Sequence, residues 1–380
     1  MKKLMSKVKE DARKKKIINK ELAPRLKVSE GMISNYYSCT NRIGGYKFAE
    51  LISIIYEGED GKIDFFLTEY PKRNNKDEHV IELLEWSHQN GKKTIQKEIL
   101  DQYSVKENPL FLYYSLFLRR SEGNISAQNF IIELENIKYK SNNSPEFKTL
   151  GWIGLLYAYY DLHNYNMLFL ADEALKEVLN IKNVKKTYNY LKESLKVRIY
   201  EIQAIGFLKE NNIQAAEKVS LKLTNAENIG AYPLPLSSAF MLLSEIYVFA
   251  SYNKSLDFIN KAINLCNKMN DTRNERWKLR LEATHDFIKI TNNDFTQLYL
   301  SDPSEQAHLY AKIGGKENEK KCLSILESIE NKKGKLSNFQ MYYKALALKS
   351  DRLLSESAEN FIKSGDLFYA QLPKRALNDH

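Results

Sequence analysis

The chain has 380 residues, of which 43% are hydrophobic, and it contains only 15 Gly and 8 Pro. This composition excludes extensive disorder, and so few helix-breaking residues favour an all-α protein with a sizeable core. The net charge is +9, but residues 1–50 hold 13 Lys and Arg against five acidic residues, so the remainder is nearly neutral. A basic end on a neutral body is typical of a protein whose one end meets a polyanion. A lysine-rich tail that only improves solubility is the alternative interpretation.

Three cysteines, Cys39, Cys266 and Cys322, lie far apart and form no CxxC pair. Their odd number and wide spacing predict neither structural disulfides nor a zinc site, which fits a reducing cytoplasm. The basic first residues are followed by no apolar stretch, so they do not form a signal peptide. No segment approaches the ~20 apolar residues that span a bilayer. We therefore expect a cytoplasmic protein without a membrane partner.

Two amphipathic helices are predicted in the basic N-terminal part of the chain. Both have apolar residues at helical spacing, so each buries one face. The second of them closes a small helical domain. The apolar positions are Leu4, Met5, Val8 and Ala12 in the first helix, and Phe48, Leu51, Ile52 and Ile55 in the second.

Between these helices, residues 19–37 (NKELAPRLKVSEGMISNYY) predict two short helices joined by a turn at Lys27 and Val28, with Ser29 as the cap of the second helix. This is the helix-turn-helix arrangement, which lays its second helix in the DNA major groove. A Gly would take the turn more easily than Lys27. The residues expected to be buried are Ala23, Leu26, Ile33 and at least one of Tyr36 and Tyr37.

Two classes of side chain in this head suit double-stranded DNA. Polar residues near the start of the second helix reach base edges, whereas basic residues neutralise phosphates and position the protein. A small helical domain that packs without binding DNA is the alternative. The candidates for base edges are Ser29, Glu30, Gly31, Ser34 and Asn35, and those for phosphates are Arg13, Lys14, Lys15, Lys16, Arg25, Lys27, Arg42 and Lys47.

The rest of the chain reads as one helix after another, separated by Asn-containing turns. Four of these turns, at Asn164, Asn212, Asn253 and Asn293, follow one another at similar intervals. Their period is longer and looser than that of a regular tetratricopeptide (TPR) repeat, but it predicts degenerate helix-pair repeats of this type, stacked into an α-solenoid with a concave groove. An irregular helical bundle is the alternative. We predict a helix-turn-helix domain over 1–60, a connecting helix (Ile63–Tyr70) and linker over 61–78, and a peptide-sensing and dimerisation domain over 79–380.

Enzyme signatures are absent from the sequence. There is no phosphate-binding GxxxxGK[ST], GxGxxG, HExxH or GxSxG, and the six His are scattered. We therefore expect no catalytic residues, no metal and no cofactor. A concave helical-repeat surface instead suits a peptide, which would contact polar or aromatic residues inside otherwise apolar helices. The candidates are Arg198, Glu201, Glu245, Arg276, Glu305, Tyr343 and Asp366; solvated faces or salt bridges between repeats are the alternative roles.

Several segments of residues 240–375 resemble the phage arbitrium receptors (the AimR family), which belong to the peptide-pheromone receptors of Gram-positive bacteria. The architecture, a helix-turn-helix head before degenerate helical repeats, resembles them over the whole chain. The chain departs at Tyr232-Pro233-Leu234-Pro235, where no basic residue stands, and at Glu245, which replaces an expected amide. The similar segments are Tyr252-Asn253, Glu305-Gln306-Ala307-His308, Tyr342-Tyr343, Phe361-Ile362-Lys363-Ser364-Gly365-Asp366-Leu367-Phe368 and Leu372-Pro373.

The resemblance implies a homodimer in the bacterial host cell that binds an operator near its own gene. It also implies that a short secreted and re-imported peptide enters the groove, changes the affinity for DNA and shifts the phage between lysis and lysogeny. Glu305, Asp366 and Phe368 match positions that line the peptide pocket of the family. The departures leave open both the sequence of the peptide and the direction of the response. An adaptor that binds a partner protein and no DNA is the alternative function.

Overall fold

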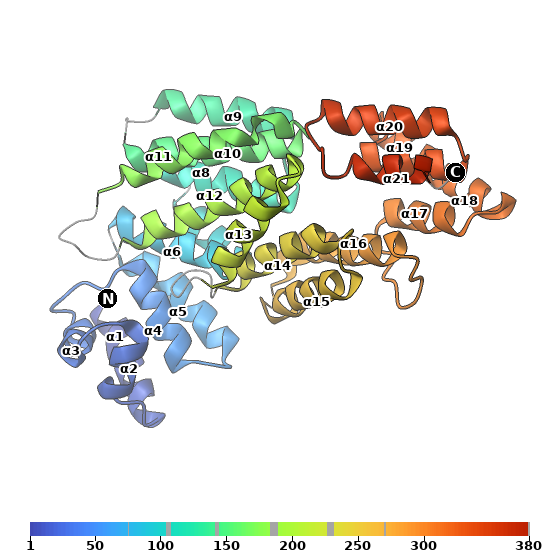
Figure 1. The fold of residues 1–380 in the computed structure, drawn as a ribbon. Coiled ribbons are helices and arrows are strands. Elements are labelled where there is room, and N and C mark those ends of the chain that lie inside the picture. The colour runs from blue at the N-terminus through green and yellow to red at the C-terminus, as the bar shows by residue number, and fades with distance from the viewer. Residues whose placement is uncertain are drawn as a thin grey trace.

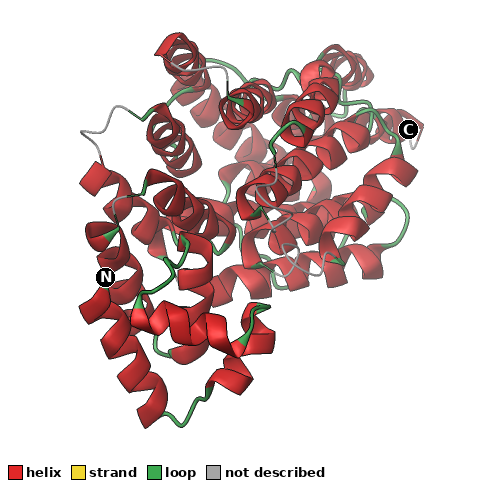
Figure 2. Ribbon diagram, turned by 90° about the vertical axis from the view of Figure 1, so that its left-hand side faces the viewer, coloured by secondary structure: helices red, strands yellow, loops and turns green. Residues whose placement is uncertain are grey.

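The structure is a computed structural model, and it describes residues 1–74, 76–103, 108–140, 144–182, 189–225, 232–269 and 271–378. Every regular element within these ranges is a helix, so the predicted all-α class is confirmed (Figure 1, Figure 2). The first helices form the head, at the lower left of Figure 1. They are α1 (Lys2–Lys14), α2 (Asn19–Leu26), α3 (Glu30–Ser38), α4 (Gly45–Ile55) and α5 (Asp60–Arg73).

The helix pair α2–α3 lies where the sequence predicts it. Lys27 ends α2 in the left-handed conformation, at φ 52° and ψ 47°. The Ser29 hydroxyl then accepts a hydrogen bond from the Met32 N–H at 3.2 Å, which satisfies one of the free N–H groups at the start of α3. Both Tyr36 and Tyr37 are buried in the head, so the aromatic end of α3 belongs to its core.

The body continues as antiparallel helices that pack each on the next. Pairs joined by short turns, such as α12 with α13 and α14 with α15, stack against the following pair, and this confirms the helical-repeat architecture. The body helices are α6 (Asp77–Gln89), α7 (Lys93–Tyr103), α8 (Pro109–Glu122), α9 (Ala127–Lys140), α10 (Pro145–Asp161), η1 (Tyr165–Leu170), α11 (Ala171–Leu179), α12 (Tyr190–Lys209), α13 (Ile213–Thr224), α14 (Pro233–Tyr247), α15 (Tyr252–Met269), η3 (Thr272–Asn274), α16 (Glu275–Thr291), α17 (Pro303–Ile313), α18 (Lys316–Lys333), α19 (Asn338–Ala347), α20 (Asp351–Lys363) and α21 (Gln371–Asn378).

Three of the predicted turns contain a residue in the left-handed conformation. His163, Asn211 and Asn293 have φ of 57°, 60° and 58°. Asn tolerates this conformation better than most residues, which suits Asn211 and Asn293. The fourth turn differs, because Asn253 already lies inside α15.

The solenoid closes on itself through the loop that joins α20 to α21 (Figure 1). The Tyr165 N–H donates to the Ser364 carbonyl at 2.9 Å, and the Leu367 N–H donates to the Lys209 carbonyl at 2.7 Å. Gly365 has φ +81°, and a Cβ there would lie 2.7 Å from the backbone N of Asn166. A glycine is therefore needed where the last helices return to the turns after α10 and α12.

The buried apolar residues divide into two large clusters. The N-terminal core extends from Leu4 in the head to Ile202 in α12. The C-terminal core runs from Ala204 in the same helix to Ala376. Helix α12 is thus shared, with its first half in one core and its second half in the other.

Candidate functional site

The start of α3 presents an exposed polar surface on the head. Ser29, Glu30, Gly31 and Ser34 are all exposed, and Asn35 is half-buried. Ser34 also accepts a hydrogen bond from the Asn19 side chain of α2 at 2.9 Å, which ties the two helices together. The residues proposed to reach base edges are therefore accessible from outside the molecule.

The basic residues of the head fall into two groups. Arg13, Lys14, Lys16, Arg25, Lys27 and Arg42 are exposed. Lys15 is also exposed, but it donates to the Ile55 carbonyl at 2.7 Å and pairs with Glu59. Lys47 is half-buried and donates to the Leu26 carbonyl at 2.6 Å, and burial lowers the pKa of its ammonium. Both of these lysines therefore bind backbone carbonyl groups at the ends of helices within the head.

A cluster of charged and aromatic side chains joins the C-terminal end of the solenoid to its middle, at the ends of α10 and α12. Lys209, at the end of α12, donates to Asp366 Oδ2 at 2.7 Å, and both side chains are buried. Its Nζ also lies 4.8 Å from the Tyr165 ring centre and 4.4 Å from that of Tyr369. Burial alone lowers the pKa of Lys209, but the Asp366 charge outweighs it and the pKa is raised. Lys209 therefore stays charged inside an aromatic cage.

Two further charged residues extend this cluster. Glu245 on α14 is half-buried, and burial raises the pKa of its carboxyl although Lys209 and Arg280 oppose the shift. Arg280 on α16 hydrogen-bonds the Tyr160 hydroxyl of α10. We call these residues the ionic cluster: Tyr160, Tyr165, Lys209, Glu245, Arg280, Asp366 and Tyr369.

A cavity of about 620 Å³ opens beside the ionic cluster. It lies between the turn after α10 and the helices α18 to α20, and Tyr165 and Asp366 belong to both the cavity wall and the cluster. Apolar side chains such as Phe339 and Phe361 alternate in its wall with polar ones such as Asn338 and Asn360. This mixture suits an extended peptide, which offers backbone amides as well as side chains.

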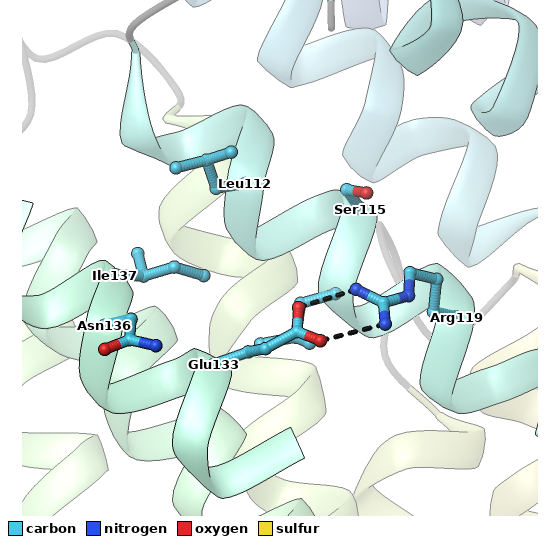
Figure 3. Close-up of a pocket in the computed structure, with 7 residues that line it drawn as sticks. Leu112, Ser115, Arg119, Glu133, Asn136 and Ile137 are labelled. Atoms are coloured by element: carbon cyan, nitrogen blue, oxygen red, sulfur yellow. Dashed lines mark hydrogen bonds and ion pairs between the residues drawn. The ribbon is translucent and has the colours of Figure 1, made fainter. Parts of the chain in front are cut away.

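A second and smaller cavity, of about 240 Å³, lies between α8 and α9 (Figure 3). Arg119 of α8 and Glu133 of α9 meet across it, with Arg119 Nη1 2.6 Å from one carboxylate oxygen and Nη2 2.9 Å from the other (Figure 3). Each partner already satisfies the other, and none of the predicted ligand residues lines this cavity.

Arg198 and Glu201, predicted to face the groove, occupy two different environments. Arg198 is 1% exposed, and its Nη1 lies 3.2 Å from Glu85 Oε2 of α6. Glu85 also accepts hydrogen bonds from Tyr114 at 2.8 Å and Ser194 at 2.6 Å. Arg198 therefore belongs to a buried network that holds α6, α8 and α12 together. Glu201 is half-buried, and burial raises its pKa to about 7 against a hydrogen bond from Ser238.

The remaining predicted ligand residues are spread over three places. Glu305 and Tyr343 are buried and hydrogen-bonded to each other at 2.9 Å, and His308 stacks on the Tyr343 ring at 4.2 Å. Arg276 is exposed and donates to the Arg120 carbonyl at 2.7 Å. Phe368 is buried against the ring of Phe249, with the ring centres 5.1 Å apart. Of the eight predicted residues, the structure thus brings Glu245 and Asp366 together around Lys209, and Glu305 together with Tyr343 at a separate place. The assignment of these residues to a peptide stays a prediction.

Lys209, Arg280, Tyr160, Tyr165 and Tyr369 were not singled out by the sequence. One signal existed for Lys209, because its spacing from Arg198 and Glu201 places all three residues on one face of α12. The other residues are brought in by helices that are distant in the chain, and no local pattern marks them.

Other kinds of site are not apparent in the described part of the chain. No group of His, Cys, Asp and Glu side chains there could hold a metal ion, and Cys39, Cys266 and Cys322 are free thiols. No described helix combines the length and the apolar character needed to cross a membrane.

Comparisons with known proteins agree with this architecture. An uncharacterized protein of Bacillus anthracis, pXO2-35, is 29% identical over 261 residues, which are 68% of this chain and 94% of that protein. A solved structure of phAimR with a ligand has a TM-score of 0.69 and 21% identity, covering 87% of this chain and 96% of that one. A selenomethionine structure of phAimR has a TM-score of 0.64 and 19% identity, covering 99% and 96%. The family model of AimR transcriptional regulator-like proteins matches residues 65–379. Because this match spans nearly the whole body, the chain belongs to the AimR transcriptional regulator-like family.

Proposed function

We propose that this protein is a peptide-responsive transcription regulator that binds operator DNA as a homodimer. The observation that carries the proposal is the exposed start of α3 beside a set of exposed basic side chains, on an otherwise nearly neutral molecule. Base edges would be contacted by Ser29, Glu30 and Ser34, and phosphates by residues such as Arg13 and Arg25. Membership of a family of transcriptional regulator-like proteins supports the same function.

A short peptide would bind at the ionic cluster and the adjoining 620 Å³ cavity. The cluster holds two cationic and two acidic side chains, which suit the carboxylate and the amine of a peptide. One member of this family, phAimR, has been solved with a ligand. We extend ligand binding to this chain and propose lysis–lysogeny control in the cytoplasm of a bacterial host as its biological role.

The peptide would act by shifting a population. A dimer reads two half-sites only if its heads are spaced by a whole number of DNA turns. A peptide that binds one dimer arrangement more tightly changes how often the heads have that spacing, and so changes the affinity for DNA.

The test is fluorescence anisotropy with labelled duplexes that tile the DNA upstream of the gene. We expect one duplex to bind tightly, with an affinity that falls by roughly 10³-fold or more between 50 and 200 mM salt if at least six phosphates are contacted. A triple charge reversal of Arg13, Lys14 and Lys16 to Glu should abolish this binding. A matched reversal of Lys316, Lys320 and Lys332, which are exposed on α18, should preserve it. Equal binding by both triple variants would contradict the proposal, and no binding by the unmodified protein would favour an adaptor.

A further inference from the structure

Helix α4 docks the head on the body through three separate elements. Its first residues approach α6 so closely that a Cβ on Gly45 would overlap the carbonyl of His79. The N–H groups of Gly45 and Tyr46 donate to Glu82 of α6. Further along α4, Glu50 Oε1 accepts a hydrogen bond from Trp86 of α6 at 2.8 Å and another from Tyr232, just before α14, at 3.1 Å.

The third element is the start of α12. Tyr190, its first residue, stacks on Tyr46 of α4, with ring centres 4.1 Å apart and planes within 4° of parallel. Another neighbour of the Tyr46 ring is the ammonium of Lys47, 4.7 Å from the ring centre. The same ammonium donates to the carbonyl of Leu26, the last residue of α2. Three contacts therefore connect a body helix to the turn that orients α3.

Two body helices at this contact with α4, namely α12 and α14, extend from it to the ionic cluster. Helix α12 begins at Tyr190 and ends at Lys209, about 28 Å away for a straight helix. Helix α14 begins beside Tyr232 and carries Glu245 near its end. The two helices are also connected midway, where Ser238 hydrogen-bonds Glu201.

We propose that Tyr46 and Lys47 are positioning residues that transmit the state of the ionic cluster to the α2–α3 pair through α12 and α14. This inference rests on the proposed function for the meaning of the signal, although the mechanical link can be measured without DNA or peptide. It also gives Lys47 a role different from a phosphate contact. The ammonium holds the end of α2, so it sets the angle at which α3 is presented.

The first experiment measures amide hydrogen exchange of residues 19–38 in the full chain. Tyr190→Leu removes the stacked ring but keeps apolar bulk, and Lys47→Met removes the ammonium. We expect each variant to raise the exchange of 19–38 by about threefold to tenfold, and the double variant to do little more than either one. Tyr190→Phe, which keeps the ring, and Lys20→Met, on the exposed side of α2, should exchange as the unmodified protein does. Additive effects of the two variants would overturn the proposed path.

The second experiment perturbs the far end of the path. Asp366→Asn removes the charge that holds Lys209, and it should change the exchange of residues 19–38 in the unmodified background. The same substitution should have a much smaller effect on 19–38 when Tyr190 is already Leu, because only the contact through Tyr232 then remains. If Asp366→Asn leaves the exchange of 19–38 unchanged in the unmodified background, α12 does not carry the signal. The same conclusion follows if it changes this exchange equally with Tyr190 and with Leu at that position.

The third experiment separates this inference from the proposed function. Lys47→Met should weaken binding to the upstream duplex while leaving the slope of log affinity against log salt unchanged, because no phosphate contact is lost. Arg25→Met, at an exposed position, should lower that slope by about 0.9. A slope reduced equally by Lys47→Met would make Lys47 a phosphate contact and overturn its positioning role. If the unmodified protein binds no DNA, the proposed function fails, whereas the exchange experiments still decide the link.

Discussion

The N-terminal and C-terminal cores of this molecule treat buried charge differently. In the N-terminal core, Glu85 and Arg198 are 0% and 1% exposed, and Glu85 accepts further hydrogen bonds from neighbouring helices. The pair is therefore a structural ion pair that holds these helices together. In the C-terminal core, Lys209 and Asp366 are also buried, but a 620 Å³ cavity borders them. Lys209 also has a second acid, Glu245, within electrostatic reach. From this difference we expect a rigid half that carries the head and an adaptable half in which, under the proposed function, a peptide replaces one of the buried partners.

The largest expected effect comes from breaking the structural ion pair of Glu85 and Arg198. Glu85→Leu leaves the guanidinium of Arg198 buried without its acid, so we expect the free energy of unfolding to fall by about 3–5 kcal/mol. The double variant Glu85→Leu/Arg198→Met should recover most of this loss, since no charge remains buried. Urea unfolding followed by circular dichroism measures both. As a control, Asp257→Asn breaks an exposed pair with Lys261 and should change stability by less than about 0.5 kcal/mol. If Glu85→Leu alone were as stable as the unmodified protein, the pair would not have this structural role.

A smaller loss is expected from the equivalent change in the adaptable half. Asp366→Asn removes the partner of Lys209, but Glu245 can take over part of the charge, so we expect a loss of about 1.5–3 kcal/mol. The same urea titration gives the value. A loss as large as that of Glu85→Leu would mean that both buried pairs are structural ion pairs, and the comparison between the two halves would fail.

The docking of the head offers a steric test of the rigid half. Gly45→Ala places a Cβ against the backbone of α6, which cannot move aside, so we expect a loss of about 1–3 kcal/mol. Gly61→Ala is the matched control, because nothing lies within 4 Å of its added Cβ and Ala favours the helix α5. Thermal unfolding and limited proteolysis of the head measure the two variants. Equal stability of Gly45→Ala and Gly61→Ala would show that α4 does not dock as described.

The smallest effect concerns pH at the same joint. Burial raises the pKa of Glu82 to about 7, against the N–H groups of Tyr46 and Gly45. A carboxyl whose pKa is raised on folding favours the folded state when protonated, so its contribution is complete below about pH 4.5 and is lost as the pH rises through 7. We expect Glu82→Gln to reduce the loss of stability between pH 6 and pH 8 by about 1 kcal/mol. Urea titrations at the two pH values measure this change in stability. If the unmodified protein and Glu82→Gln lose the same stability between pH 6 and pH 8, a group other than Glu82 titrates in this range.

Local features of the fold were predictable from the sequence because their causes are local. Helix spacing placed α1 and α4, and Ser29 marked the start of α3 because its hydroxyl caps the helix that follows it. The tight turn at Lys27 was predicted as well, although this residue does not favour a left-handed conformation.

The interior roles of charged residues were not predictable in the same way. Arg198 looked like a groove residue, since a charged side chain within an apolar helix can face either a ligand or a buried partner. Its partner Glu85 is 113 residues away, and only the fold brings the two together. The ionic cluster likewise draws on α10, η1, α12, α14, α16 and the loop before α21, so no segment of the sequence contains its pattern.

The closed solenoid has a consequence for how the protein is made. The contacts between Tyr165 and Ser364 and between Lys209 and Leu367 join parts of the chain that lie far apart in the sequence. A ribosome therefore releases the head and the first helices long before the closing loop exists. Until residues 364–367 emerge, the wall of the large cavity is incomplete and Lys209 has no Asp366. We therefore expect a newly synthesised chain to complete its proposed ligand site last, after the part that carries the head has folded.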